Sequence, residues 1–185
     1  MTDADWFQHV STAVALMLCA CFGCDPASAE AASRFVPAYI ENDTTPQAPR
    51  NKNVVYYALS LMQNSGYDYI QHSTKEVSGQ TKTTIKKTIP VNCLLTFYGS
   101  NADNDSEKFW SMFQWDSGAE SPRAILRSKN IVPIGKPERP VSLFETEGTF
   151  HRRRCDVRLN LAYYEVTEHG SSAVTEPPEI EITQV

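Results

Sequence analysis

The chain has 185 residues, of which 41% are hydrophobic and 21% are charged. This length and composition are typical of one soluble globular domain that spans residues 1–185 and has a hydrophobic core of its own. The formal net charge of −5 argues against a nonspecific nucleic-acid-binding protein. The five cysteines are an odd number, and two of them fall on predicted core strands, which favours reduced thiols over a disulfide framework.

Residues 1–24 are predicted to form an amphipathic helix. Apolar residues recur there at intervals of three and four from Trp6 to Cys21, and Gly23 is a typical helix end. A secretory signal is the alternative, because residues 13–22 are apolar and a lipoprotein-like cleavage box ends at Cys21. The first nine residues carry two aspartates and no Lys or Arg, whereas a signal peptide begins with basic residues. The sequence therefore favours a docked helix.

A long strand, a glycine turn and a helix are predicted in succession over residues 84–113. Period-two alternation places five strand residues on one face, namely Ile89, Val91, Cys93, Leu95 and Phe97. Gly99 can adopt a backbone conformation that other residues avoid, which suits the turn after the strand. In the helix, Phe109 and Phe113 recur at helical spacing. This succession predicts a core in which a helix packs on a sheet.

The remaining elements are shorter, except for one strand. Phe150–Val166 is predicted to be a second long strand and the antiparallel partner of Ile89–Phe97. Ser121 as a cap and Pro122 at the first helical position predict a short helix. We also predict a short strand at Phe35–Ile40, a mostly buried strand at Val54–Met62, a short strand at Ile131–Gly135 and an extended link at Arg139–Phe144.

Two segments are candidates for arms. Residues 64–84 are rich in Ser, Thr, Gly, Lys and Gln, and they predict either a β-hairpin with its turn near Ser78-Gly79 or a loop. A projecting hairpin cannot bury its own surface and would need a neighbour. Residues 168–185 begin as a polar linker, and the Ile180-Glu181-Ile182 segment within them can add an edge strand or an arm to another chain.

The sequence contains no recognisable catalytic or cofactor motif. Its four histidines are not spaced as metal ligands, and it has no nucleophile elbow, phosphate-binding glycine loop or dinucleotide fingerprint. Three acidic residues at a predicted helix start, Asp103, Asp105 and Glu107, are interpreted as charges that favour the helix dipole. Three adjacent basic residues, Arg152, Arg153 and Arg154, form either a basic contact surface or a solvated strand end. We therefore expect a non-enzymatic protein without cofactor or metal.

Three short motifs in this order are similar to those of a known family. They are the Pro46-Gln47-Ala48-Pro49-Arg50 entry to a strand, the Tyr98-Gly99-Ser100-Asn101-Ala102 turn from strand to helix, and the late strand that carries Arg152-Arg153-Arg154-Cys155-Asp156-Val157. With the order of the predicted elements, they resemble the neck and tail terminator proteins of tailed bacteriophages. The resemblance covers most of residues 35–166.

The resemblance implies an α+β fold, in which an antiparallel β-sheet is flanked by helices and a β-hairpin projects. It further implies a structural virion protein that is made in the host cytoplasm and forms a ring, usually of six copies. Such a ring terminates the tail tube and joins it to the head–tail connector. The implied partners are copies of the chain itself, the tail tube protein, the connector or stopper protein, and DNA that passes through the lumen, without a membrane.

These considerations give a set of candidate subunit contacts. The aromatic residues of the hairpin arm and the aliphatic residues of the C-terminal arm are predicted to contact neighbouring copies, namely Tyr67, Tyr69, Ile180 and Ile182. The acidic group Asp103, Asp105 and Glu107 is predicted to complement Arg152, Arg153 and Arg154 across neighbouring subunits. The alternative class is an exported bacterial lipoprotein or periplasmic binding module with a lipidated Cys21, and the intact mass distinguishes the two.

Overall fold

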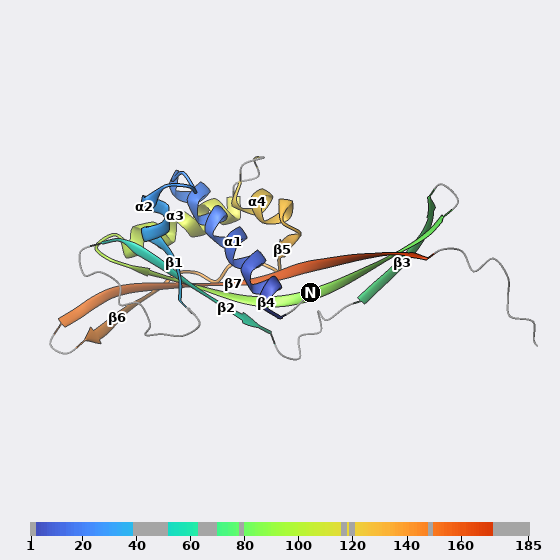
Figure 1. Ribbon diagram of the computed structural model, residues 1–185. Helices are drawn as coiled ribbons and strands as arrows, with labels where there is room; N and C mark the ends of the chain where they lie inside the picture. Colours follow the sequence, from blue (N-terminus) through green and yellow to red (C-terminus); the bar gives the residue numbers. More distant parts are fainter. Residues whose placement is uncertain are drawn as a thin grey trace, which may run out of the picture.

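The computed structural model describes residues 3–38, 52–62, 70–77, 80–115, 118, 121–147 and 150–171. Seven described strands form one sheet, and the four described helices lie on one of its faces (Figure 1). The predicted α+β fold, a sheet flanked by helices, is confirmed. The Pro46–Arg50 motif, Tyr67, Tyr69, Ile180 and Ile182 lie outside the described residues.

The helices and strands alternate only in part along the chain. The helices are α1 (Asp3–Phe22), α2 (Ala29–Arg34), α3 (Ala102–Trp115) and α4 (Pro122–Ser128). The strands are β1 (Phe35–Pro37), β2 (Val54–Leu61), β3 (Ile70–Val77), β4 (Gln80–Tyr98), β5 (Ile131–Pro133), β6 (Val141–Glu147) and β7 (Phe150–Ser171). The strand order is β1-β2-β4-β7-β5, while β3 pairs with β4 and β6 pairs with β7. The β1–β2 pair is parallel and the other pairs are antiparallel.

The centre of the sheet is the antiparallel ladder of β4 and β7. It runs from the Thr81–Ser171 pair to the Tyr98–Arg154 pair, so both strands are longer than predicted. The residues at alternate positions on one face are at most 2% exposed, namely Val91, Cys93, Leu95 and Phe97 on β4 and Cys155, Val157, Leu159 and Leu161 on β7. The predicted pairing of the two long strands and the predicted core face are therefore confirmed.

Helix α1 packs along this core face. Its inward residues are completely buried, namely Val10, Ala13, Val14, Met17 and Leu18. The helix ends where predicted, because Gly23 has a positive φ of 68° and the Cys24 N–H donates a hydrogen bond to the Cys19 carbonyl at 2.9 Å. No helix in the described part of the chain is long and apolar enough to cross a membrane.

Helix α3 covers the same face and follows directly from β4. Its buried residues are Ala102, Ser106, Phe109 and Phe113. Gly99 makes the predicted turn with a φ of 111°, and the Asn101 N–H donates a hydrogen bond to the Asn53 Oδ1 at 3.2 Å. The turn is therefore tied to the chain that enters β2.

Gly99→Ala should destabilise the protein by about 2–3 kcal/mol. The positive φ is strained for a residue with a side chain. The new Cβ would also lie against the Asn53 side chain and 2.9 Å from the Lys52 carbonyl oxygen, and that backbone cannot move away freely. Urea denaturation followed by circular dichroism measures the loss. Gly23→Ala is the matched control, because that glycine also has a positive φ but nothing lies within 4 Å of its added Cβ, so its loss should be smaller.

The hairpin prediction is confirmed for β3 and β4, whose pairing runs from Ile70–Lys87 to Val77–Gln80. The predicted turn at Ser78-Gly79 lies outside the described residues. The hairpin is continuous with the central ladder, because β4 is a single strand and β7 accompanies it to Ser171. The outer parts of β4 and β7, with β3, form a three-stranded extension beyond the helices, which we call the arm (Figure 1).

Two predictions need correction, and one helix was not predicted. The predicted link Arg139–Phe144 ends inside strand β6, which pairs with the first residues of β7. The predicted linker after residue 168 begins as strand, because β7 continues to Ser171. Helix α2 was not predicted, and it is short and buries only Ala31, with Ser28 as its N-cap. Residues 141–146 are all exposed and α2 is short, so hydrophobic periodicity does not reveal β6 or α2.

Candidate interaction surfaces

The acidic start of helix α3 has partners within the same chain. Asp103 lies 3.2 Å from Arg153 Nη1, and its other carboxylate oxygen accepts a hydrogen bond from the Ser142 hydroxyl at 2.7 Å. Asp105 lies 3.1 Å from Arg34 Nη2, in a pair whose side chains are only 21% and 17% exposed. These contacts attach α3 to β6, β7 and α2. Glu107 lies exposed on the same helix.

A second charged group lies on the opposite face of the sheet. Tyr98, Arg154 and Asp156 alternate with the buried residues of β4 and β7, and so they point away from the helices. Arg154 donates two hydrogen bonds to Asp156, with N–O distances of 2.8 and 2.7 Å, and lies 3.9 Å from Glu145. The Tyr98 hydroxyl donates to Glu145 at 2.9 Å, and the Arg152 guanidinium lies 5.2 Å from the Tyr98 ring centre.

Burial and charge together alter the titration of this group. Partial burial and the Glu145 carboxylate raise the pKa of Tyr98 to about 12, against a smaller opposing effect of Arg154. The hydrogen bonds with Asp156 raise the pKa of Arg154 above its usual range, although burial acts in the opposite direction. The bidentate hydrogen bonds of Arg154 with Asp156 fix the two strand residues next to each other.

The structure brings together some of the predicted contact residues, but within one chain. Asp103 meets Arg153, whereas Asp105 meets Arg34 and Arg154 meets Asp156. A complementary role of these charges across subunits stays a prediction, and in that role they would have to exchange partners. The Arg154–Asp156 contact could have been found in the sequence, because residues i and i+2 of a strand share a face. The Arg34–Asp105 contact depends on the docking of α2 and carries no local signal.

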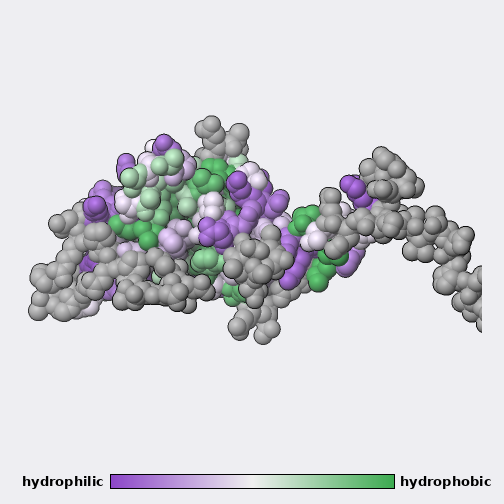
Figure 2. Space-filling view, viewed as in Figure 1, coloured by the Kyte–Doolittle hydropathy of each residue, from purple (hydrophilic) through white to green (hydrophobic). Residues whose placement is uncertain are grey.

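Exposed apolar side chains gather at both ends of the sheet. The large hydrophobic residues that are exposed in the described part of the chain are Leu61, Ile70, Trp115, Val141, Leu143, Phe144 and Val166. Leu61, Ile70 and Val166 lie where the arm leaves the body, Leu61 and Ile70 on the face that carries the helices and Val166 on the opposite face. We call the exposed apolar side chains of β6 the β6 patch, in which Val141 and Leu143 lie on the face away from the helices and Phe144 lies on the other face. Figure 2 shows hydrophobic side chains between hydrophilic ones on the described part of the arm.

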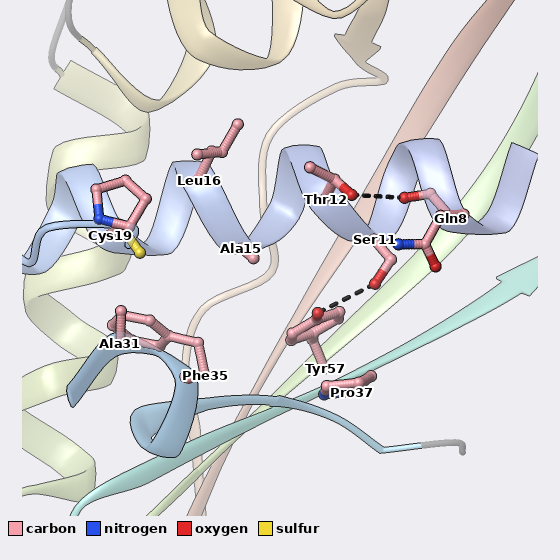
Figure 3. A pocket seen from close by; sticks show the side chains of 12 residues that line it. Gln8, Ser11, Thr12, Ala15, Leu16, Cys19, Ala31, Phe35, Pro37 and Tyr57 are labelled. Carbon is pink, nitrogen blue, oxygen red and sulfur yellow. Dashed lines mark hydrogen bonds between the residues drawn. The ribbon is translucent and has the colours of Figure 1, made fainter. Parts of the chain in front are cut away.

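A groove of about 350 Å³ lies between α1 and the edge of the sheet (Figure 3). Ala15 and Leu16 of α1 line one side, and Phe35 and Pro37 line the other. The Ser11 and Tyr57 hydroxyl oxygens are 3.0 Å apart and hydrogen-bonded to each other. The Thr12 hydroxyl donates a hydrogen bond to the Gln8 carbonyl at 2.8 Å, and most of the other lining residues are apolar.

The five cysteines form no disulfide, and four of them are buried, namely Cys19, Cys21, Cys93 and Cys155. Within the described part of the chain, no three His, Cys, Asp or Glu residues are grouped so that they could hold a metal ion. Cys93 is the most affected thiol, since burial raises its pKa from 9.0 to about 12. It packs in the core of β4, with 1% of its surface exposed.

The free energy of unfolding should therefore fall as the pH rises from about 9 to about 12. In this range the unfolded chain releases the Cys93 proton while the folded chain retains it, so the folded state binds more protons and loses stability with rising pH. Urea denaturation at pH 8 and pH 10.5 measures the difference. Cys93→Ala should show a smaller fall between the two pH values than the wild type, and an equal fall would mean that this thiol ionises freely in the folded protein.

Comparisons with models of known protein families and with the sequences of curated proteins find no match. The described residues define the class of the fold, an α+β protein whose helices cover one face of a long antiparallel ladder. Its distinguishing surfaces are the arm and the β6 patch at opposite ends of that ladder.

Proposed function

We propose that this chain is a structural protein of a bacteriophage neck. Copies of it form a ring, usually of six, that terminates the tail tube and joins it to the head–tail connector. The observation that carries the proposal is the arm, a three-stranded extension that runs beyond the described helices (Figure 1). Among residues 70–87, none whose exposure is described is buried.

A strand ribbon of this kind has little stability of its own. Its exposed apolar residues gain stabilisation only where another surface covers them. An assembly in which each copy contacts the next through two different surfaces closes into a ring when the rotation between copies permits it. A ring that surrounds a tail tube and a DNA channel is such an assembly, and it requires no catalytic group.

Two of the three motifs that resemble the tail terminator family lie at defined positions in this fold. The Tyr98–Ala102 segment connects the central strand β4 to helix α3 through the positive φ of Gly99. The Arg152–Val157 segment begins the ladder with β4 and includes the Arg154–Asp156 pair. Both motifs therefore support a shared architecture, because each one specifies a junction of the sheet.

The alternative of a lipoprotein anchored at Cys21 conflicts with the packing of α1. Cleavage before Cys21 would remove Val10, Val14 and Met17, which are completely buried against the sheet. The exposed core would cost several kcal/mol of stability, at about 1.5–3 kcal/mol for each large apolar side chain. We therefore expect the protein in infected cells to have an intact mass that includes residues 1–20, and a chain that begins at a lipidated Cys21 would favour the alternative.

Electron microscopy of purified phage particles and of detached tails tests the proposed function. We expect a ring of this protein at the head-proximal end of the tail tube, and a particle reconstruction gives the number of copies. Particles made without the protein should carry tails of irregular length that fail to join heads. A protein that is absent from particles, or that lies elsewhere in them, would contradict the proposal.

A further inference from the structure

Two of the three cysteines at the C-terminal end of helix α1 are held next to each other by the backbone. Gly23 has a positive φ of 68°, and the Cys24 N–H donates a hydrogen bond to the Cys19 carbonyl at 2.9 Å. This is the hydrogen bond of a Schellman motif, in which the side chains at the two ends of the bond typically contact each other. The end of the helix therefore places the Cys19 and Cys24 side chains together.

The same hydrogen bond limits the distance between the two backbone positions. With standard bond lengths on either side of the 2.9 Å contact, the Cα atoms of Cys19 and Cys24 are no more than roughly 7 Å apart. A disulfide joins Cα atoms that are about 4.4–6.8 Å apart. The turn after Cys24 is fixed as well, because Asp25 accepts hydrogen bonds from the Ala27 N–H and the Ser28 N–H, each at 3.0 Å. The two cysteines are therefore held at a distance that a disulfide can span.

The surroundings of the two sulfur atoms agree with this placement, because both side chains face helix α2. Cys19 lines the groove together with Ala31, and Figure 3 shows its sulfur on the side of α1 that faces Ala31. The Cys24 sulfur lies 4.0 Å from Nη1 of Arg34, which also belongs to α2. Burial raises the pKa of Cys19, and the charge of an ionised Cys24 raises it further, an effect that requires the two thiols to be close.

The two thiols differ in their access to reagents in solution. Cys19 is 3% exposed, whereas Cys24 is partly exposed. The third cysteine, Cys21, is 2% exposed and lies roughly 200° around the helix from Cys19, so it points away from that thiol. An oxidant in solution therefore reaches Cys24 first, and Cys19 is the neighbouring thiol that can complete a bond.

We propose that Cys19 and Cys24 are a dithiol that a low-molecular-weight disulfide, such as oxidised glutathione, converts into an intramolecular disulfide. The Cys24 thiolate attacks one glutathione sulfur, which breaks the glutathione S–S bond, forms a mixed disulfide and releases one glutathione thiolate. The Cys19 thiolate then attacks the Cys24 sulfur and releases the second glutathione thiolate. The protein loses two protons and two electrons, and the oxidant takes them up as two glutathione thiols. This inference goes beyond the proposed function and does not depend on it.

The new bond would join the last turn of α1 to the loop that precedes α2. Because the bond closes a short loop in the unfolded chain, we expect the melting temperature of the oxidised protein to exceed that of the reduced protein by about 3–8 °C. Differential scanning calorimetry of the two forms measures this shift. Equal melting temperatures would overturn a stabilising role of the bond.

Thiol labelling and peptide mapping of the full-length protein test the pair. The reduced protein, with its five free thiols, is incubated with oxidised glutathione, alkylated under denaturing conditions and digested with chymotrypsin, which cleaves after Phe22. We expect a loss of two thiols, a Cys19 peptide joined to a Cys24 peptide by a bond that reduction breaks, and an alkylated Cys21. A glutathione adduct that persists on Cys24, or alkylation of all five cysteines, would overturn the proposal.

Two alanine variants give a matched comparison. Cys24→Ala removes the attacking thiol, so it should keep its remaining thiols through the glutathione treatment. Cys21→Ala removes a neighbouring thiol outside the pair, so it should lose two thiols as the wild type does. A loss of two thiols in Cys24→Ala, or of none in Cys21→Ala, would overturn the assignment to Cys19 and Cys24. If a variant does not fold, the peptide map of the wild type decides between the same outcomes.

Discussion

Replacing Phe109 with alanine should lower the free energy of unfolding by about 3–5 kcal/mol, the range for removal of a buried aromatic side chain. Phe109 is completely buried on the inner face of α3. Its ring centre lies 6.1 Å from that of Phe97 on β4 and 5.6 Å from that of Phe113 on α3. The substitution therefore leaves a cavity at the junction of the helix layer and the central strand, where the neighbours cannot close it easily.

Urea denaturation of the two proteins, with intrinsic fluorescence and circular dichroism as probes, gives this difference. The matched control is Trp115→Ala on the same helix, because Trp115 is 77% exposed and its loss should change the free energy of unfolding by about 0.5 kcal/mol or less. If the two substitutions had equal effects, the packing of α3 on the ladder would be wrong. A changed m value would indicate instead that the variant exposes a different amount of surface on unfolding.

The central ladder could be predicted from the sequence because one of its faces is covered. The apolar residues from Val91 to Phe97 occupy alternate positions, as do those from Cys155 to Tyr163, and the helices cover only the face to which these residues point. A covered face imposes period-two hydrophobicity on both partners. The glycine turn that leads into α3 could be predicted for a similar reason, because a positive φ restricts the residue type at position 99.

The length of the ladder could not be predicted, because both faces of the arm are partly exposed. Lys82, Thr84, Lys86 and Thr88 share one face, so no hydrophobic alternation marks this part of β4 as strand. Strand β6 escaped prediction for the opposite reason. Its apolar side chains are exposed, and the strand is held by its pairing with β7 instead of by burial. Patterns of burial therefore identify the core, whereas surfaces that await a partner give weak local signals.

The charged contacts show a similar limit. The sequence predicted that the acidic start of α3 and the arginines of β7 would be complementary, and the structure pairs Asp103 with Arg153 inside one chain. Charge composition alone does not distinguish an internal pair from a pair between subunits. In the structure, Asp103 has a second partner in the same chain, because Ser142 of β6 also donates a hydrogen bond to it. That strand is the element that the sequence did not reveal.

A chain that lacks the arm should fold normally and fail to assemble. Ile70 and Lys87 are directly opposite each other, so residues 71–86 can be replaced by the two-residue turn Asn-Gly, which suits an antiparallel hairpin. In this variant the pairing of β7 with β4 would end at Glu165, the partner of Lys87, and the rest of the chain would be kept. None of the removed residues 71–86 whose exposure is described is buried. We therefore expect the melting temperature to shift by about 5 °C or less.

Size-exclusion chromatography with light scattering should then show only monomers of the shortened chain. The matched control is a chain that ends after Ser171, which keeps the whole described arm and removes only residues 172–185. If the control assembles and the shortened chain does not, the arm is the assembling element. If both lose assembly, the C-terminal residues carry a contact, as predicted for Ile180 and Ile182. Assembly of the shortened chain would contradict a role of the arm, and its failure to fold would mean that the arm stabilises the body from which it extends.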